Sequence, residues 1–468
     1  MKRIAVMLLL ALFTVSMVLF GVGCKEEAAE AAEEVEEAAE EVEEEVEEAA
    51  EEVEEAAEEV EEAAEEEQKV VKIGYLMPLS GPNSAWVNAQ LTGLAMWLDE
   101  VNGSGGIEVG GEKYMVEMIK EDTENVPAKA LEGAKKLVLE DGVVMIMQLQ
   151  GAEISATQPF LNEHKIPVFT VCALDIGPDR PYVFSVGQNW PNGIPMGMQY
   201  VVDNYPEAKN LVFAGEDYDV SYLGRAFLKA GAEILGLNLV YDEVYAVDTL
   251  DFAPIADAIM AKDPDIFSPQ GAYVSSQMLL IKELYLRGFD GVFFHEEWPY
   301  AELLNVVPKD YIVGRFITQA GYIGDDLIDP VGKQIYADWM ARFGPGAPED
   351  VKRDFIWIDW LGQTFTRAWR HGVELADSFE GEAVVKALES SDAIPHPFGT
   401  SVWTGEEMFG INHQLLIPQY ITVCQEVDGA LRDVTVAKYD VDEWFHTDDR
   451  IDVFVKYLKE EGVHYSQK

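Results

Sequence analysis

The stretch His-Glu-Glu-Trp at residues 295–298 combines groups that could move protons. His295 is followed directly by Glu296 and Glu297, which places an imidazole beside two carboxylates. Such groups act as general acids and bases when a reacting partner is held within hydrogen-bond reach. The sequence lacks the nucleophile motif Gly-x-Ser-x-Gly, a Gly-rich dinucleotide loop after a strand and the phosphate-binding Walker loop. We therefore expect a protein that is not an enzyme.

Cysteine and histidine usage indicates neither a metal centre nor a cofactor. The seven histidines are scattered, and no pair has metal-ligand spacing. Beyond Cys24, only Cys172 and Cys424 remain, and neither belongs to a Cys-x-x-Cys pair. An exported pair of cysteines could form a disulfide, but two buried free thiols are the expectation.

Trp86 lies where a strand gives way to a helix. An apolar run at 70–77 ends at Pro78, and a helical pattern begins near Ala85. The helix has a buried stripe formed by Val87, Leu91, Leu94, Ala95 and Leu98, and Trp86 lies about one helical step off it. Loops that follow strands bind ligands in open α/β sheets. Trp86 is therefore either one wall of a ligand site or an aromatic ring that covers the helix end.

The chain is strongly acidic, with a net charge of −53 over 468 residues. Part of this charge is local, because residues 25–67 contain 25 Glu and one Lys. The remainder is also acidic, which argues against a nucleic-acid-binding protein, since a phosphate backbone requires a basic face. The length suits two domains and additional segments.

The first 24 residues resemble a bacterial lipoprotein signal. Lys2 and Arg3 precede an apolar stretch at 4–20, and small residues lead to Cys24. The resemblance implies cleavage after residue 23 and a lipid on Cys24, which would attach the protein to a membrane outside the cytoplasm. The family's usual leucine three positions before the cysteine is Gly21 here. The alternatives are an ordinary cleaved signal and a transmembrane anchor.

Residues 25–67 repeat every seven residues. Small apolar side chains fall on two heptad positions: Ala32, Ala39, Val46, Val53 and Val60 on one, and Ala28, Val35, Val42, Ala49, Ala56 and Ala63 on the other. This seam is typical of a coiled coil, but Glu side chains at i,i+4 repel one another. We expect a partly helical stalk at 24–69 that holds the folded body off a membrane; a weakly associating coiled coil is the alternative.

From Val70 onward, strand and helix patterns alternate. We expect the first series of strands at 70–77, 114–119, 143–148, 167–172 and 182–186, with helices at 85–101, 127–139 and 154–162. A break at 188–193 precedes a second series, with strands at 210–215, 238–244, 266–269 and 292–295 and helices at 222–234, 253–261 and 275–286. Two successive βα series predict an α/β protein with two Rossmann-like, doubly wound lobes.

Several segments, in this order, resemble the type I periplasmic binding proteins of branched-chain amino acid (Leu/Ile/Val) transporters. They include VKIGYLMPLSGPNSAW, ATQPFLNEHKIPVF, DFAPIADAIMAKDPDIFSPQGAY and ELYLRGFDGVFF. The resemblance covers roughly residues 70–450 and implies two lobes joined by three crossovers, with a ligand between them. It places lobe 1 at 70–188 plus 323–408 and lobe 2 at 189–322 plus 409–450, followed by a C-terminal segment at 451–468. The implied partners are a small solute and the permease and ATPase of an ABC importer.

The resemblance also implies ligand-binding positions. Trp86 corresponds to the aromatic residue that covers the ligand, and Glu297 to the acid that pairs with its ammonium group. Gly151 stands at or near a serine that binds the α-carboxylate, and Cys172 and Leu174 match a segment that supplies a carbonyl and a threonine. On the second lobe the implied positions are Tyr218 or Val220, Gly271 and Tyr273.

The departures from the family bear on the ligand. The hydroxyl donors are lost at 151 and 174, unless Ser155 substitutes, whereas the acceptor Glu297 is retained. Glu297 with Trp86, Trp298 and Tyr218 could favour a cation through an aromatic cage. Alternatively, backbone N–H groups at 151–153 still hold a carboxylate. Trp190, in QNWPNG, is either another wall or a packed hinge residue. The expected ligand is an amino acid or a related amine or carboxylate.

Three classes of function fit these features. The first is a transport binding protein, and the second is a ligand-sensing receptor module of the same fold. The third is a structural lipoprotein in which the stalk matters most. Ligand-dependent closure would separate the first two from the third.

We predict that mature protein from a bacterial membrane fraction begins at a lipidated Cys24. A Cys24→Ala variant, which lacks the thiol, should be released from membranes or remain unprocessed. Mass spectrometry of the mature N-terminus checks this. An unmodified terminus downstream of Cys24 would contradict it.

Overall fold

The computed structural model describes residues 69–80, 84–148, 151–186, 191–319, 329–348, 351–352, 355 and 358–467, without the side chains of Ala85 and Trp86. Residues 69–468 form one compact unit. The expected signal, Cys24 and the stalk lie outside the described residues, and so does Trp190. The expectations for these segments therefore stay predictions.

The first sheet is mostly parallel. Among the described residues it contains eight strands in the order β14-β15-β6-β5-β4-β1-β3-β2. The strands span Val70–Met77 (β1), Ile107–Val109 (β2), Glu112–Asp122 (β3), Ile146–Gln148 (β4), Val168–Thr170 (β5), Val183–Ser185 (β6), Trp403–Thr404 (β14) and Gln414–Leu415 (β15). The five strands from β6 to β3 run parallel, and β2 and β14 pair antiparallel at the two ends.

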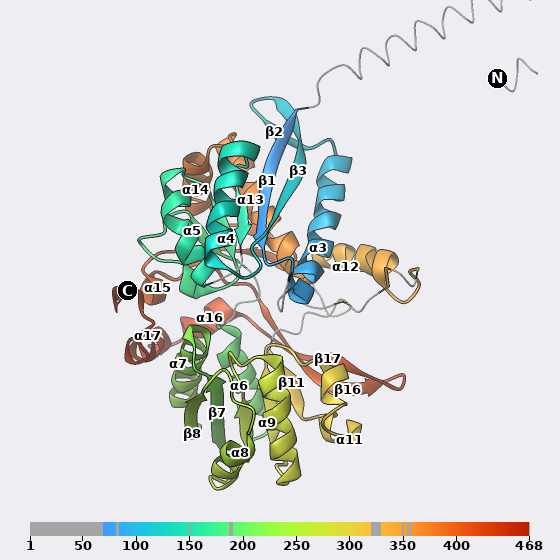
Figure 1. The fold of residues 1–468 in the computed structure, drawn as a ribbon, viewed down its shortest axis with the longest axis vertical. Helices are drawn as coiled ribbons and strands as arrows, with labels where there is room; N and C mark the ends of the chain where they lie inside the picture. Colours follow the sequence, from blue (N-terminus) through green and yellow to red (C-terminus); the bar gives the residue numbers. More distant parts are fainter. Residues whose placement is uncertain are drawn as a thin grey trace, which may run out of the picture. The chain divides into compact units, whose positions relative to one another are not determined.

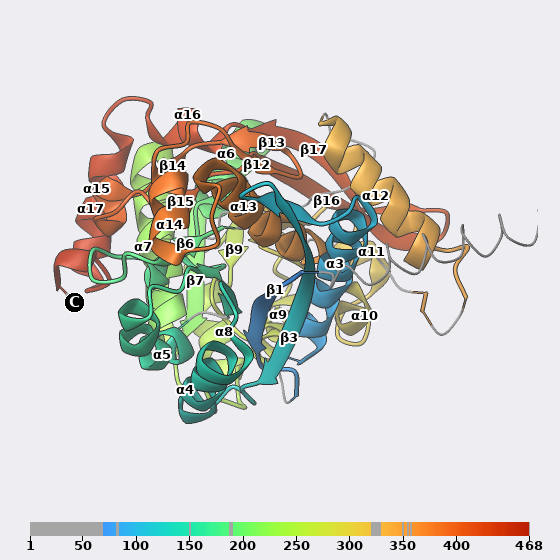
Figure 2. The ribbon, with the colours of Figure 1, turned by 90° about the horizontal axis from the view of Figure 1, so that it is seen from above.

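Helices cover both faces of this sheet because its strands are apolar on both sides. Along β1, Leu76 packs on the side of α4, whereas Ile73, Tyr75 and Met77 pack on the side of α3 and α13 (Figures 1 and 2). Such two-sided burial is typical of parallel strands. The helices of this lobe span Ser84–Gly103 (α3), Pro127–Lys136 (α4), Ala152–Glu163 (α5), Pro330–Phe343 (α12), Asp359–Ala376 (α13), Gly381–Glu389 (α14) and Glu406–Phe409 (α15). A π-turn at Leu137–Asp141 continues α4, a 3-10 turn follows β5 at Ala173–Asp175, and a hairpin pairs β12 (Ile394–His396) with β13 (Gly399–Ser401).

The second sheet repeats this design. Within the described residues its seven strands have the order β17-β16-β11-β10-β9-β7-β8. They span Asn210–Glu216 (β7), Asn238–Tyr245 (β8), Ile266–Ser268 (β9), Val292–His295 (β10), Phe316–Thr318 (β11), Gln419–Val427 (β16) and Ala430–Tyr439 (β17). Its helices span Gly193–Asn204 (α6), Asp219–Leu235 (α7), Ala253–Met260 (α8), Val274–Leu286 (α9), Tyr300–Leu303 (α10), Lys309–Ile312 (α11), Val441–Phe445 (α16) and Arg450–Glu460 (α17), with a 3-10 turn at Tyr465–Gln467. The expectation of an α/β fold with two doubly wound lobes is thus confirmed.

The chain passes between the two sheets three times: from β6 to α6, from β11 to α12, and from β15 to β16. The third passage lies at residues 416–418, because β15 still belongs to the first sheet and β16 to the second. The expected change of lobe between 408 and 409 is therefore too early. The two-residue strands β14 and β15 are too short to give a periodic signal.

The C-terminal helix belongs to the second lobe rather than to a separate segment. It packs against α7, and Lys229 on α7 pairs with Glu460 and Glu461 at 3.1 and 2.6 Å. After His295 the sequence predicts no individual strands or helices, because short strands and helices follow one another there without a clear period. No helix among the described residues is long and apolar enough to cross a membrane.

A polar contact joins the second and third passages. The side-chain amide of Gln419 donates to the backbone oxygen of Gln319, and the Gln319 amide exchanges hydrogen bonds with Gln270 at 3.1 and 3.3 Å. Gly193, at the start of α6, lies against this pair, since a Cβ there would be 3.1 Å from Oε1 of Gln419. Described residues at one end of each passage, Gly193, Gln319 and Gln419, are therefore in contact at one place.

Two glycines allow close contact between α3 and α13 in the first lobe. A Cβ on Gly93 would lie 1.9 Å from the backbone oxygen of Asp359, and one on Gly362 would lie 2.7 Å from the backbone nitrogen of Leu94. These neighbours are backbone atoms and cannot rotate away. The two helices can therefore approach closely only because both positions lack a side chain.

We predict that Gly93→Ala destabilises the folded body by about 1–3 kcal/mol or more, because overpacking forces the two helices apart. Gly103→Ala, at the end of the same helix, is the matched control, since a Cβ at this position would have no neighbouring atom within 4 Å. Denaturant unfolding measures both variants. Equal stability of the two would show that α3 and α13 move apart at no cost.

Candidate functional site

The carboxyl ends of the two parallel sheets face each other. The chain leaves β6 and β11 at their carboxyl ends and enters the other lobe directly from each. Cys172, which follows β5, is close enough to Tyr218, which follows β7, to influence the pKa of the Tyr218 hydroxyl. Residues that end strands in different lobes are therefore neighbours, and this is where doubly wound sheets present ligand-binding groups.

Tyr218 and Tyr273 form a stacked pair at this place. Each is the residue before a helix, α7 and α9 respectively, and their ring centroids are 5.5 Å apart at an interplanar angle of 11°. Tyr273 is 49% exposed. Burial and neighbouring acidic groups raise the pKa of Tyr218 well above its ordinary value, so its hydroxyl stays neutral. The structure therefore brings these two predicted residues together; Val220 instead packs against the core.

Gly271 allows the N-termini of α7 and α9 to lie close together. Its φ is +78°, and a Cβ there would lie 2.7 Å from Cα of Ser221, in the first turn of α7. A side chain would be strained by the backbone conformation and would also clash with that turn. Gly271 therefore shapes the candidate site without offering a side chain to a ligand.

Glu216 is a buried carboxylate that is not among the site residues predicted from the sequence. It ends β7, is fully buried, and accepts hydrogen bonds from the Ser276 hydroxyl and, at 3.3 Å, from the backbone N–H of Tyr273. Burial raises the pKa of its carboxyl group. The available signal was a charged residue at the end of the apolar strand sequence NLVFAGE. Glu216 fixes the start of α9 and with it the position of Tyr273.

The His-Glu-Glu-Trp stretch is held by its histidine. His295 is buried, and its Nδ1–H donates to the backbone oxygen of Glu297 at 3.0 Å. Burial lowers the pKa of His295 to about 4, so the ring is neutral near pH 7 and acts as a support for the turn. Glu297 is half-buried at the carboxyl end of β10.

Trp298 is a core residue, and the hypothesis that it helps to form an aromatic cage is wrong. It is 5% exposed, packs on Phe293 and Phe316, and donates from Nε1 to the backbone oxygen of Ile317 at 2.9 Å. Trp298 follows two acidic residues in the sequence, but its ring lies against Phe293 and Phe316 of the second sheet. Its indole is therefore buried with its one donor satisfied.

On the first lobe, Gly151 precedes α5 with φ +84° and an exposed backbone. Its N–H donates to Oδ1 of Asp175 at 3.0 Å. Cys172 and Cys424 are both buried and form no disulfide, which confirms the expectation of two buried thiols. Leu174 is half-buried against the core, and Ser155 is exposed on α5. Trp86 lies in the first turn of α3, and its side chain is outside the described structure.

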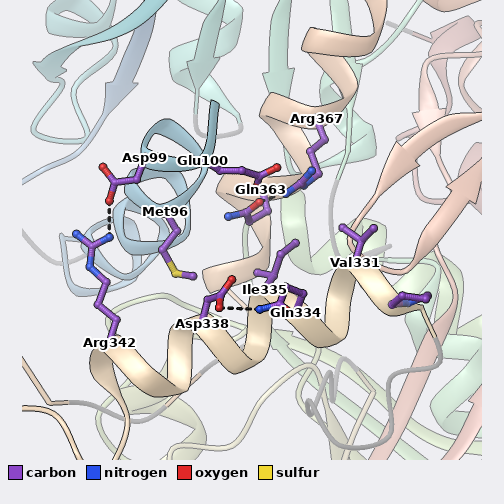
Figure 3. Close-up of a pocket in the computed structure, with 11 residues that line it drawn as sticks. Met96, Asp99, Glu100, Val331, Gln334, Ile335, Asp338, Arg342, Gln363 and Arg367 are labelled. Atoms are coloured by element: carbon purple, nitrogen blue, oxygen red, sulfur yellow. Dashed lines mark hydrogen bonds and ion pairs between the residues drawn. The ribbon is translucent and has the colours of Figure 1, made fainter. Parts of the chain in front are cut away.

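A separate cavity of about 660 Å³ lies on the first lobe between α3, α12 and α13. Figure 3 shows Met96 and Ile335 in its wall, together with Arg342 paired to Asp99 across the groove. Arg367 is likewise paired to Glu100. Its charged side chains are already paired, and none of the predicted site residues lines it. Among the described residues, no group of three or more His, Cys, Asp or Glu side chains could hold a metal ion.

Comparison with known proteins agrees with the fold. The family described as periplasmic binding protein matches residues 70–426. A Leu/Ile/Val-binding protein, BraC3, of Rhizobium johnstonii is 23% identical over 344 residues, covering 70% of this chain and 86% of that protein. The leucine-binding protein LivK of Thermotoga maritima superposes with a TM-score of 0.64 at 19% identity, covering 80% of this chain and 100% of the other.

Another similar solved structure holds a ligand of a different chemical class. A solute-binding protein of an ABC transporter from R. palustris, in complex with 4-hydroxybenzoate, superposes with a TM-score of 0.62 at 18% identity, covering 81% of this chain and 100% of the other. The same fold therefore holds ligands of more than one kind in different proteins. The fold has two mostly parallel sheets whose carboxyl ends face each other, with three passages of the chain between them. Because the family match also covers most of its length, this chain belongs to the periplasmic binding protein family.

Proposed function

We propose that this protein captures a small organic solute between its two lobes and delivers it to the permease and ATPase of an ABC importer. The observation that carries the proposal is the meeting of the carboxyl ends of both sheets at Tyr218, Tyr273 and the segment after β10. Membership of the family supports a solute-binding role. The named ligands of the relatives, amino acids and an aromatic acid, support an organic solute of similar size.

Two parts of the proposal rest on the sequence. The apolar N-terminal stretch and Cys24 support export and a lipid anchor, which would place the protein outside the cytoplasm at a membrane. The Glu-rich segment at 25–67 supports a tether between that anchor and the body. The proposal assigns no chemical transformation to the protein.

Binding would require the lobes to close on the solute. The stacked tyrosines belong to the second lobe, and Gly151, Cys172 and Trp86 to the first. A solute that contacts both sets would stabilise a closed arrangement by the difference in its affinity for the two states. The passages, joined through Gln319, are the natural hinge for such a movement.

We predict that Tyr218→Ala and Glu297→Gln each weaken binding of the solute at least tenfold, equivalent to about 1.4 kcal/mol. The control is Glu302→Gln, which removes an exposed acid from the nearby α10. A thermal-shift screen first identifies the solute, since a ligand at about 100 times its Kd stabilises the protein by about 2.7 kcal/mol. Calorimetry then measures the variants. Unchanged affinity in both would place the site elsewhere, and the absence of any ligand would count against the function.

A further inference from the structure

A carboxylate of the protein itself occupies the N-terminus of α5. Asp175 is 2% exposed, and its Oδ1 accepts the Gly151 N–H at 3.0 Å while its Oδ2 accepts the Thr170 hydroxyl at 3.3 Å. Gly151 is the residue that immediately precedes α5. The N-terminus of a helix attracts anions through its unpaired N–H groups and its dipole. Here one of those donors is used, and a negative charge is already in place.

A second acid lies in the first turn of the same helix. Glu153 is 3% exposed, and its Oε1 accepts the Thr123 hydroxyl at 2.6 Å. Its buried Oε2 has no hydrogen-bond partner within the part of the chain that the structure describes. The N-terminus of α5 therefore carries two buried carboxyl groups of the protein, and Asp175 already accepts the Gly151 N–H that an anion of a solute would need.

Arg180 does not turn this end of α5 into an anion site. Its guanidinium donates to the backbone oxygen of Asp175 at 3.2 Å and stays 4.0 Å from the carboxylate. The adjacent Asp179 accepts a hydrogen bond from Asn162, near the C-terminal end of α5. Arg180 is therefore ion-paired within the protein, with Asp175 at 4.0 Å and with Asp179 at 3.6 Å.

The second lobe offers acids and aromatic rings at the facing edge. The loops that follow β7, β8, β9 and β10, at 217–218, 246–252, 269–273 and 296–299, contain no lysine or arginine. They do contain acidic residues: Asp217, Asp248, Asp251, Glu296 and Glu297. A carboxylate of a solute would find no basic side chain in these loops, whereas a cation would find both negative charge and ring faces.

The groups around Tyr218 also indicate a negative electrostatic potential at this edge. Apart from burial, the leading influences on its hydroxyl come from Tyr273, Glu216, Glu296 and Cys172, and each raises the pKa of Tyr218 as a negative charge does. Two of these residues follow strands of the second sheet, and Cys172 follows a strand of the first. A phenol and a thiol are neutral near pH 7, so the negative charge beside the stacked tyrosines comes from the carboxyl groups of the second lobe, Glu216 and Glu296.

We propose that the solute of this site is an organic amine bound as its ammonium ion, and that Asp175 sets this preference by occupying the anion position at α5. The inference rests on the proposed function, because it names the class of solute for that same site. The ammonium group would lie at the acidic edge of the second lobe against the stacked tyrosines. The solute would present no carboxylate to Gly151. This differs from the amino acids and the aromatic acid named for the relatives.

The test compares molecules that differ only in their charged group. One set is isopentylamine, leucine and 4-methylpentanoate, and a second is 4-hydroxybenzylamine and 4-hydroxybenzoate, within a wider library of matched sets. Thermal shift finds the members that bind the folded body, and calorimetry gives their affinities. We expect each bound amine to exceed its matched carboxylate or zwitterion at least tenfold. A carboxylate or zwitterion that binds as well as its amine overturns the inference and leaves the proposed function intact.

Asp175→Asn tests the residue itself. The amide keeps an oxygen for the Gly151 N–H but removes the charge, so the preference for the amine should fall at least threefold. Asp179→Asn removes an acid with 79% side-chain exposure from the same segment and should leave the preference unchanged. Thermal unfolding of both variants confirms that they are folded. An unchanged preference in folded Asp175→Asn overturns the role of Asp175. If no member of the library binds the wild-type protein, the result counts instead against solute binding.

Discussion

The three passages of the chain between the sheets are the constraint on which the rest of the structure depends. Gln319 joins the second passage to the third through Gln419, and Gly193 brings the first against the same pair. Because the chain leaves β6 and β11 at their carboxyl ends, the two sheets must turn those ends towards each other. The position of the candidate site follows from this, since strand-end residues of both lobes meet only there.

Three buried polar groups hold the turns at the carboxyl ends of the strands in a fixed conformation. Glu216, His295 and Asp175 are each almost completely buried and bonded to the backbone of a neighbouring turn. A buried polar group without such a partner costs roughly 1–3 kcal/mol, so these contacts are needed for the turns to hold their conformation. Their effect is to fix Tyr273, the turn at Glu297 and the start of α5 before a solute arrives. Fixed binding groups lose little conformational entropy on binding.

The family scaffold and the chemistry of the site are separable. This chain shares its fold with solved proteins at 18–19% identity, yet Gly151 and Leu174 replace the hydroxyl side chains implied by the resemblance. The position left by those donors is not empty, because Asp175 approaches from the 3-10 turn after β5. The same fold therefore leaves room for different groups at the N-terminus of α5, where here a carboxylate of the protein accepts the Gly151 N–H.

The sequence by itself determined the elements with strong local patterns. The apolar runs and helical stripes from Val70 to His295 predict β1, β3 to β10 and the main helices except α6, because side-chain periodicity depends on near neighbours. The short strand β2 was not predicted. The resemblance to periplasmic binding proteins then implied Tyr218 or Val220, Tyr273 and Glu297 as ligand-binding positions, and the structure brings Tyr218 and Tyr273 together. Cys172 and Cys424 are two buried free thiols, as expected, although the sequence also allowed a disulfide between them.

Tertiary structure alone decided which of the remaining residues serve the site. The sequence allows Trp298 to join Glu297, Trp86 and Tyr218 in an aromatic cage, but the fold packs its ring against Phe293 and Phe316. Glu216 and Asp175 were missed because one acid at a strand end gives no periodic signal, and its partners, Ser276 and Gly151, are distant in sequence. The short strands β14 and β15 likewise acquire their lobe only through pairing with β6 and each other. Contacts of this kind depend on loop closure and packing over many residues, which local sequence patterns do not encode.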